Sequence, residues 1–154
     1  MQLSEVFRTL GETGLAELLR HVSIGPLRAY QLYESLKVRA HVRKLNTQTL
    51  RKSAPRFWAR LVGGDEDLAR DLAQGVLVSN LGMVQAVLDF LGVPHRDGFF
   101  EKDVDASPYL SEGWQQRVWE RFRGQYPDTL LLFYINHLGW ELGKAEEVFA
   151  PAAA

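Results

Sequence analysis

Apolar residues at helical spacing between Asp65 and Leu91 constrain the fold more than any other feature of this chain. Three acidic residues begin the segment at Asp65, where a helix dipole favours negative charge, and Gly92 and Pro94 end it. One stripe of apolar residues follows a 4-3-4-3 spacing: Leu77, Leu81, Val84, Leu88 and Leu91. A second stripe lies beside it and contains Met83, Val87 and Phe90. A helix that is apolar over so much of its girth is typical of a helical bundle. Gly75 and Gly82 indicate a break near Gly75 or the close approach of another helix.

Several other segments also carry helical signals. One helix is predicted through Leu15 to Val22, and a second begins near Pro26, where the missing N–H of proline is tolerated. Asn46 is expected to cap a third, starting near Thr47, that Pro55 kinks or splits. A further helix carries a stripe of three residues: Trp114, Val118 and Phe122.

Two segments are compatible with either a helix or a strand. Residues 37–45 begin with "KVRAHVRK", which alternates basic and apolar residues, and residues 129–136 are too uniformly apolar for periodicity to decide. We favour helix for residues 37–45, because a strand needs a pairing partner and the chain offers no clear second strand. We favour helix for residues 129–136 because their segment is about a dozen residues long and its neighbours are helical. The sequence therefore predicts an all-α fold, an irregular bundle of about six to eight helices. We expect residues 1–150 to form a single domain and residues 151–154 a disordered C-terminal tail.

Composition narrows the class of protein. The chain has 154 residues, of which 46% are hydrophobic and 24% charged, as in soluble globular proteins. It contains no Cys, which excludes disulfides and thiolate metal sites. The N-terminal residues lack the pattern of a secretory signal, and no apolar run approaches the ~20 residues of a membrane span. We therefore expect a cytoplasmic protein that does not bind membranes.

Charge is distributed unevenly along the chain despite a net charge of -1. Between Arg28 and Arg60 there are nine Lys or Arg residues and one acid, Glu34. Such a basic region can bind phosphates with release of counterions, unless the acidic remainder of the chain neutralises it across the fold. A helix, a turn and the helix at Thr47 superficially resemble a helix-turn-helix, although the intervening segment is too long and Pro55 interrupts the second helix. The candidate contacts are Lys37, Arg39, Arg43, Lys44, Gln48, Arg51, Lys52, Arg56 and Arg60.

Signatures of catalysis are weak. Glycine-rich phosphate loops, nucleophile elbows and metal-ligand motifs are absent from the sequence. The pairs Glu17–His21 and His137–Glu141 have i, i+4 spacing, but two ligands do not make a metal site. His95 and Asp97 lie in a long loop, and His137 lies in the most apolar segment, so these three are candidates for a polar pocket. We expect no catalytic residue, metal or cofactor, and we expect His137 to be a buried structural histidine.

Three functions are consistent with these observations. The first is a non-catalytic binding or protein-interaction module, which includes self-association as a homo-oligomer, suggested by the leucine spacing and the four Trp residues. The second is nucleic-acid binding through the basic residues 37–60. The third is a small-molecule-binding protein or an enzyme with a pocket between helices.

Overall fold

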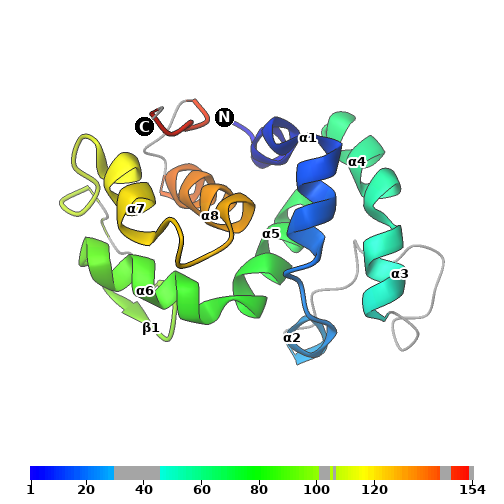
Figure 1. Cartoon of the computed structure of the whole chain (residues 1–154), viewed down its shortest axis with the longest axis horizontal. Helices are drawn as coiled ribbons and strands as arrows, with labels where there is room; N and C mark the ends of the chain where they lie inside the picture. Colours follow the sequence, from blue (N-terminus) through cyan, green and yellow to red (C-terminus); the bar gives the residue numbers. More distant parts are fainter. Residues whose placement is uncertain (30–45, 101–104, 106, 143–146, 153–154) are drawn as a thin grey trace. The chain divides into compact units, whose positions relative to one another are not determined.

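Helices make up most of the regular structure in the computed structural model of the chain, which describes residues 1–29, 46–100, 105, 107–142 and 147–152 (Figure 1). Within these residues there are eight helices and one two-stranded sheet. The predicted all-α class with six to eight helices is therefore confirmed. Residues 37–45 lie outside the described residues, whereas 129–136 are helical, as expected.

The chain divides into two compact units, which we call the N-terminal unit (Gln2–Asn80) and the C-terminal unit (Leu81–Ala154, with Met1). The N-terminal unit contains five helices: α1 (Leu3–Leu19), α2 (Ile24–Ala29), α3 (Thr47–Lys52), α4 (Ala54–Val62) and α5 (Glu66–Ser79). The C-terminal unit contains α6 (Leu81–Leu91), β1 (His95–Arg96), β2 (Phe99–Phe100), α7 (Trp114–Phe122) and α8 (Asp128–Glu141). The expectation that 1–150 form a single domain stays a prediction.

In the N-terminal unit, α1 packs against α4 and α5. Gly11 interrupts α1 with a left-handed φ of 74°, which glycine adopts without strain. The core lies between these helices and includes Phe7, Phe57 and Leu61, all fully buried. Burial of each such side chain contributes about 1.5–3 kcal/mol, so this packing stabilises the unit more than helix propensity does.

The predicted helix Asp65–Leu91 is wrong as a single element, because α5 ends at Ser79 and α6 begins at Leu81. Asn80 interrupts it, and its Nδ2 donates to the carbonyls of Val76 (2.8 Å) and His21 (2.9 Å). Gly75 stays helical and marks a close approach instead. A Cβ at that position would lie 2.8 Å from Leu27 Cδ2, so any larger residue would force the buried Leu27 side chain of α2 to shift.

The described residues contain no single helix that is long and apolar enough to cross a membrane. The consecutive helices α5 and α6 have sufficient length and apolar content only when taken together, across the interruption at Asn80.

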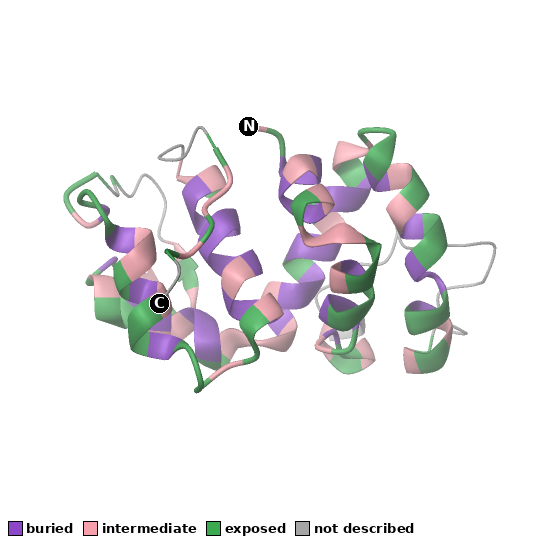
Figure 2. Cartoon of the chain, turned by 45° about the horizontal axis from the view of Figure 1, so that its top comes forward, coloured by how far each residue is buried: buried purple, intermediate pink, exposed green. Residues whose placement is uncertain are grey.

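In the C-terminal unit, α7 packs against both α6 and α8. The ring of Phe90 on α6 meets that of Phe122 on α7 edge-on, with their centroids 5.6 Å apart. Nine of the ten residues of α8 from Leu130 to Gly139 are buried, so this helix forms the core of the unit (Figure 2). The nearly uniform apolarity that obscured its periodicity in the sequence results from burial on all sides.

A short hairpin follows α6, where only a loop was expected. His95 pairs with Phe100 and Arg96 with Phe99. Asp97 (φ 54°) and Gly98 (φ 93°) form a two-residue turn with both φ values positive, the geometry that Asp-Gly favours. Gly98 lies against α6, since a Cβ there would be 3.2 Å from Leu81 Cδ2.

Candidate functional site

The described basic residues of the predicted anion-binding region lie on α3 and α4. Asn46 begins α3 by accepting a hydrogen bond from the Thr49 amide at its Oδ1 (2.8 Å), as the sequence predicted. Gln48, Arg51 and Lys52 then share one side of α3, because residues three and four apart are neighbours on a helix. All three are exposed, opposite the fully buried Leu50.

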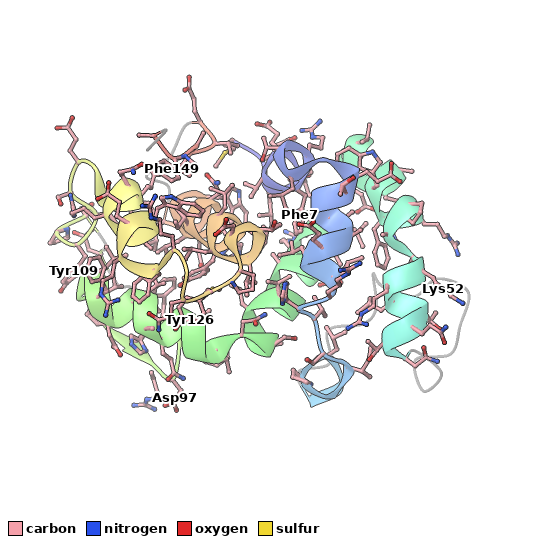
Figure 3. All side chains as sticks on the ribbon, in the orientation of Figure 1. Phe7, Lys52, Asp97, Tyr109, Tyr126 and Phe149 are labelled. Atoms are coloured by element: carbon pink, nitrogen blue, oxygen red, sulfur yellow. The ribbon has the colours of Figure 1, made fainter. Side chains whose placement is uncertain are left out.

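Ser53 separates α3 from α4, and Pro55 lies in the first turn of α4, so this proline splits the predicted helix. Arg56 follows directly and is exposed. We call Gln48, Arg51, Lys52 and Arg56 the α3–α4 basic cluster. Its three cations make no ion pair with any acid of the described residues, and Lys52 extends away from α3 (Figure 3).

Arg60 differs from the other basic candidates because it is engaged by an acid. Its Nε and Nη2 both contact Asp65 Oδ2, at 2.8 and 2.7 Å. Asp65 also accepts the Leu68 amide at Oδ1 (3.0 Å), which caps α5. The Leu68 amide and the Arg60 guanidinium hold the pKa of Asp65 below its usual value, against the opposing effect of partial burial. Arg60 therefore stabilises the connection between α4 and α5.

The remaining basic candidates, Lys37, Arg39, Arg43 and Lys44, lie outside the described residues. The structure therefore describes the basic region only over residues 46–62, which contain four cations and no acid. Exposed Lys and Arg side chains at this density can contact several phosphates of one nucleic-acid backbone.

His95 and Asp97, the first two pocket candidates, lie on the hairpin. His95 Nδ1 accepts the Gly98 amide (3.0 Å), which leaves Nε2 to carry the proton toward Asp89 Oδ1 (2.7 Å). Nδ1 thus closes the hairpin turn on itself, and Nε2 holds the hairpin against α6. Asp97 is exposed and occupies the first position of the turn.

His137, the third pocket candidate, is buried on α8 with only 5% of its side chain exposed. Its ring lies between those of Phe133 and Trp140, with centroids 5.9 and 5.5 Å away. Among the residues that the structure describes, His137 Nδ1 has no hydrogen-bond partner, and Glu141 Oε2 at 3.6 Å is too far for a hydrogen bond. His137 is therefore buried, as expected, but without the backbone partner for this nitrogen that a buried histidine usually has.

Loss of hydration perturbs the pKa values of three groups on this part of α8: Tyr134 and His137 are buried, whereas the side chain of Glu141 is still 39% exposed. This loss of hydration lowers the pKa of His137 to about 4 and raises the pKa of Glu141 to about 7. It also raises the pKa of Tyr134, as does the negative charge of Glu141. At neutral pH the imidazole is uncharged, and the carboxyl group is divided between its two forms. Such shifts occur both in active sites and in structural cores.

Among the described residues, the two histidines of the predicted polar pocket do not contact the same side chains. His95 contacts Asp89 and Gly98, whereas His137 contacts Phe133, Trp140 and Glu141. Among the described residues, no three His, Asp or Glu side chains are grouped so as to hold a metal ion. Of the Glu17–His21 pair, Glu17 lies within α1 and His21 follows its end at Leu19.

Sequence reasoning missed several residues that determine these sites. Asp89 and Asp65 are the acidic partners of His95 and Arg60, and Asn136 of α8 binds the C-terminal segment. The Asp97-Gly98 pair was a usable signal, because this dipeptide favours a tight hairpin turn. For Asn136, the signal was an amide inside an otherwise apolar helix, which needs a buried partner.

No family model, curated protein or solved structure matches this chain.

Proposed function

We propose that this chain is a non-catalytic binding module whose α3–α4 basic cluster contacts the phosphates of a nucleic acid. The observation that carries the proposal is the exposure of Arg51, Lys52 and Arg56 without an ion pair in the described part of the chain. Unpaired cations cost little to bring to a phosphate, because no existing salt bridge has to be broken first.

Local charge supports the same proposal. Residues 46–62 contain no Asp or Glu, so the described cluster has no acid of its own sequence to neutralise it. In the sequence, Lys37, Arg39, Arg43 and Lys44 precede the cluster directly. Phosphate contacts of this kind give affinity without sequence readout, typically with a Kd of about 10⁻⁴–10⁻⁶ M.

Protein association, our first expectation from the sequence, has less support from the geometry. The leucine spacing that suggested it crosses the break at Asn80, so Leu77 belongs to α5 and Leu81 to α6. Val84 and Leu88 of the same spacing are buried within the protein. They are therefore not part of an exposed leucine seam.

Fluorescence anisotropy with a labelled DNA duplex tests the proposal. The variant Arg51→Gln/Lys52→Gln/Arg56→Gln removes three exposed cations, and we expect it to lose most of its affinity at low salt. A matched control, Arg20→Gln/Arg121→Gln/Arg123→Gln, removes three exposed cations at other places in the chain and should bind as the unmodified protein does. Circular dichroism establishes that both variants are folded.

A charge-preserving variant separates charge from shape. Arg51→Lys/Lys52→Arg keeps both cations and should bind within about two-fold of the unmodified protein, because phosphate attraction depends mainly on charge. If both triple variants lose affinity equally, the attraction belongs to the chain as a whole and the α3–α4 basic cluster is not the binding surface. Absence of binding by the unmodified protein at low salt would reject nucleic acid as the partner.

A further inference from the structure

Near its C-terminus, the chain lies against its own helices α7 and α8 (Figures 1 and 3). The segment Glu147–Ala152 is irregular in structure, and two side-chain amides hold it. Asn136 of α8 bonds the backbone of Phe149, and Gln116 of α7 accepts the Ala152 amide at its Oε1 (3.0 Å). We call Asn136, Gln116 and the surrounding surface of α7 and α8 the segment site.

Asn136 forms hydrogen bonds with both backbone groups of Phe149, the amide and the carbonyl. Its Oδ1 accepts the Phe149 amide (2.6 Å), and its Nδ2 donates to the Phe149 carbonyl (3.2 Å). One residue exchanging both bonds with another is the pairing of two neighbouring antiparallel strands. The side-chain amide therefore stands in for a strand residue, and a peptide backbone is what it binds.

Burial makes this pairing necessary rather than incidental. Asn136 is only 2% exposed, in a helix whose neighbouring residues Ile135 and Leu138 are fully buried. Its second Nδ2 hydrogen bonds Leu132 O (3.2 Å) on the same helix. Leaving such a buried amide without its Phe149 partner would cost about 1–3 kcal/mol. The site is thus built to hold a peptide segment.

We propose that the segment site also accepts Glu147–Ala152 from a second copy of this chain. Every copy carries both the site and the segment that fits it, and the contacts are the same whether the segment is supplied within one chain or between two. Exchange of an identical element is a low-cost route to a dimer. Attachment to the same chain favours internal docking through an effective concentration of about 1 mM, so exchange requires comparable protein concentrations. This inference is independent of the α3–α4 basic cluster.

Two complementary variants test the exchange. Asn136→Ala destroys the site but keeps the segment, whereas Phe149→Pro removes the amide hydrogen from the segment but keeps the site. Neither variant alone can form the Asn136–Phe149 pairing, within a chain or between chains. When the variants are mixed at about 1 mM each, one molecule of each can form a single pairing, in which the segment of Asn136→Ala binds the site of Phe149→Pro.

Light scattering should show the mixture moving towards the mass of a dimer while each variant alone remains smaller. Replacing either partner in the mixture by the double variant Asn136→Ala/Phe149→Pro should abolish the rise. A mixture of folded variants that behaves as the sum of its parts would overturn the proposal. So would an equal rise with the double variant, because the association would then not use this pairing.

A measurement on the unmodified protein covers the case in which a variant fails to fold. We would add a synthetic hexapeptide of residues 147–152 to ¹⁵N-labelled protein at about 10 mM, above the effective concentration of the attached segment. The amide signal of Phe149 should weaken as the peptide displaces the attached segment. A peptide N-methylated at its Phe should have no such effect, and equal effects of both peptides, or of neither, would contradict the proposal.

Discussion

Replacing His137 by Leu should change how the stability of the protein depends on pH. His137 is buried, its Nδ1 has no hydrogen-bond partner in the described part of the chain, and burial lowers its pKa from 6.5 to about 4. Between these two values the unfolded chain binds a proton that the native protein does not. The free energy of unfolding therefore falls as the pH drops below 6.5, and the loss is complete only below about pH 4.

The magnitude follows from the two pKa values. At 1.36 kcal/mol per unit, the whole difference corresponds to about 3 kcal/mol, of which about 2 kcal/mol is lost by pH 5. His137→Leu removes this titration and places an apolar side chain of similar size between Phe133 and Trp140. We expect the free energy of unfolding of the variant, relative to that of the unmodified protein, to rise by about 2 kcal/mol as the pH falls from about 7.5 to 5.

Glu141 acts in the opposite direction and requires a control. Its pKa is raised from 4.5 to about 7, so the native protein keeps a proton that the unfolded chain releases, and stability falls as the pH rises through this range. The two groups therefore partly cancel in the unmodified protein. Making His137→Leu in both the Glu141 and the Glu141→Gln background isolates the histidine.

Urea unfolding followed by circular dichroism at three pH values measures these differences. In both backgrounds, the stability difference between the Leu and His proteins should grow as the pH falls. A difference that stays constant within about 0.5 kcal/mol would show that His137 titrates normally and that our account of its burial is mistaken.

Four further substitutions test the packing and capping, each by urea unfolding. Gly75→Ala should destabilise the protein by about 1–3 kcal/mol because the new Cβ would meet buried Leu27, whereas Gly82→Ala, exposed and with open space around it, should stabilise it by about 0.4–1 kcal/mol. The reverse order would refute the close approach of α2 to α5. Asn46→Ala should cost about 1 kcal/mol through loss of the α3 cap, and no loss would mean that the cap is not formed. Asp65→Asn should destabilise the protein more at neutral pH than in acid, because the lowered pKa of Asp65 contributes its full stability above the unfolded pKa of 3.8 and loses it as the pH falls from 3.8 through the lower folded pKa. An effect that is equal at both pH values would exclude this charge as its cause.

Local signals in the sequence were sufficient for much of the N-terminal unit. Asn46 caps α3 as predicted, because the interaction spans only three residues and needs no tertiary partner. Pro55 splits the helix for an equally local reason. In the C-terminal unit, the helical state of residues 129–136 was also predicted, although from the length of the segment and its helical neighbours rather than from periodicity.

Long-range contacts account for the features that were missed. A break near Gly75 was plausible from propensity, but the chain breaks at Asn80, whose side chain bonds the carbonyl of His21, 59 residues away. Gly75 is instead explained by Leu27. Neither partner could be identified from the spacing within the segment itself.

The candidate sites divide in the same way. The exposure of Arg51 and Lys52 could be predicted, because their helical spacing in the sequence places them opposite Leu50 on one helix. The pairing of Arg60 with Asp65 depends on the turn at Gly63 and Gly64, which returns the chain so that the start of α5 meets the end of α4. The pairing of Asn136 with Phe149 joins residues 13 apart, beyond the reach of helical periodicity.

The salt dependence of DNA binding tests the central claim of a phosphate-contacting surface most directly. If Arg51, Lys52 and Arg56 each contact a phosphate, the slope of log K against log salt should become shallower by about 2.7 in their triple Gln variant. The unmodified protein should accordingly lose about 40-fold more affinity than that variant between about 50 and 200 mM salt. Parallel slopes for the two proteins would contradict the account, since these three cations would then release no counterions on binding.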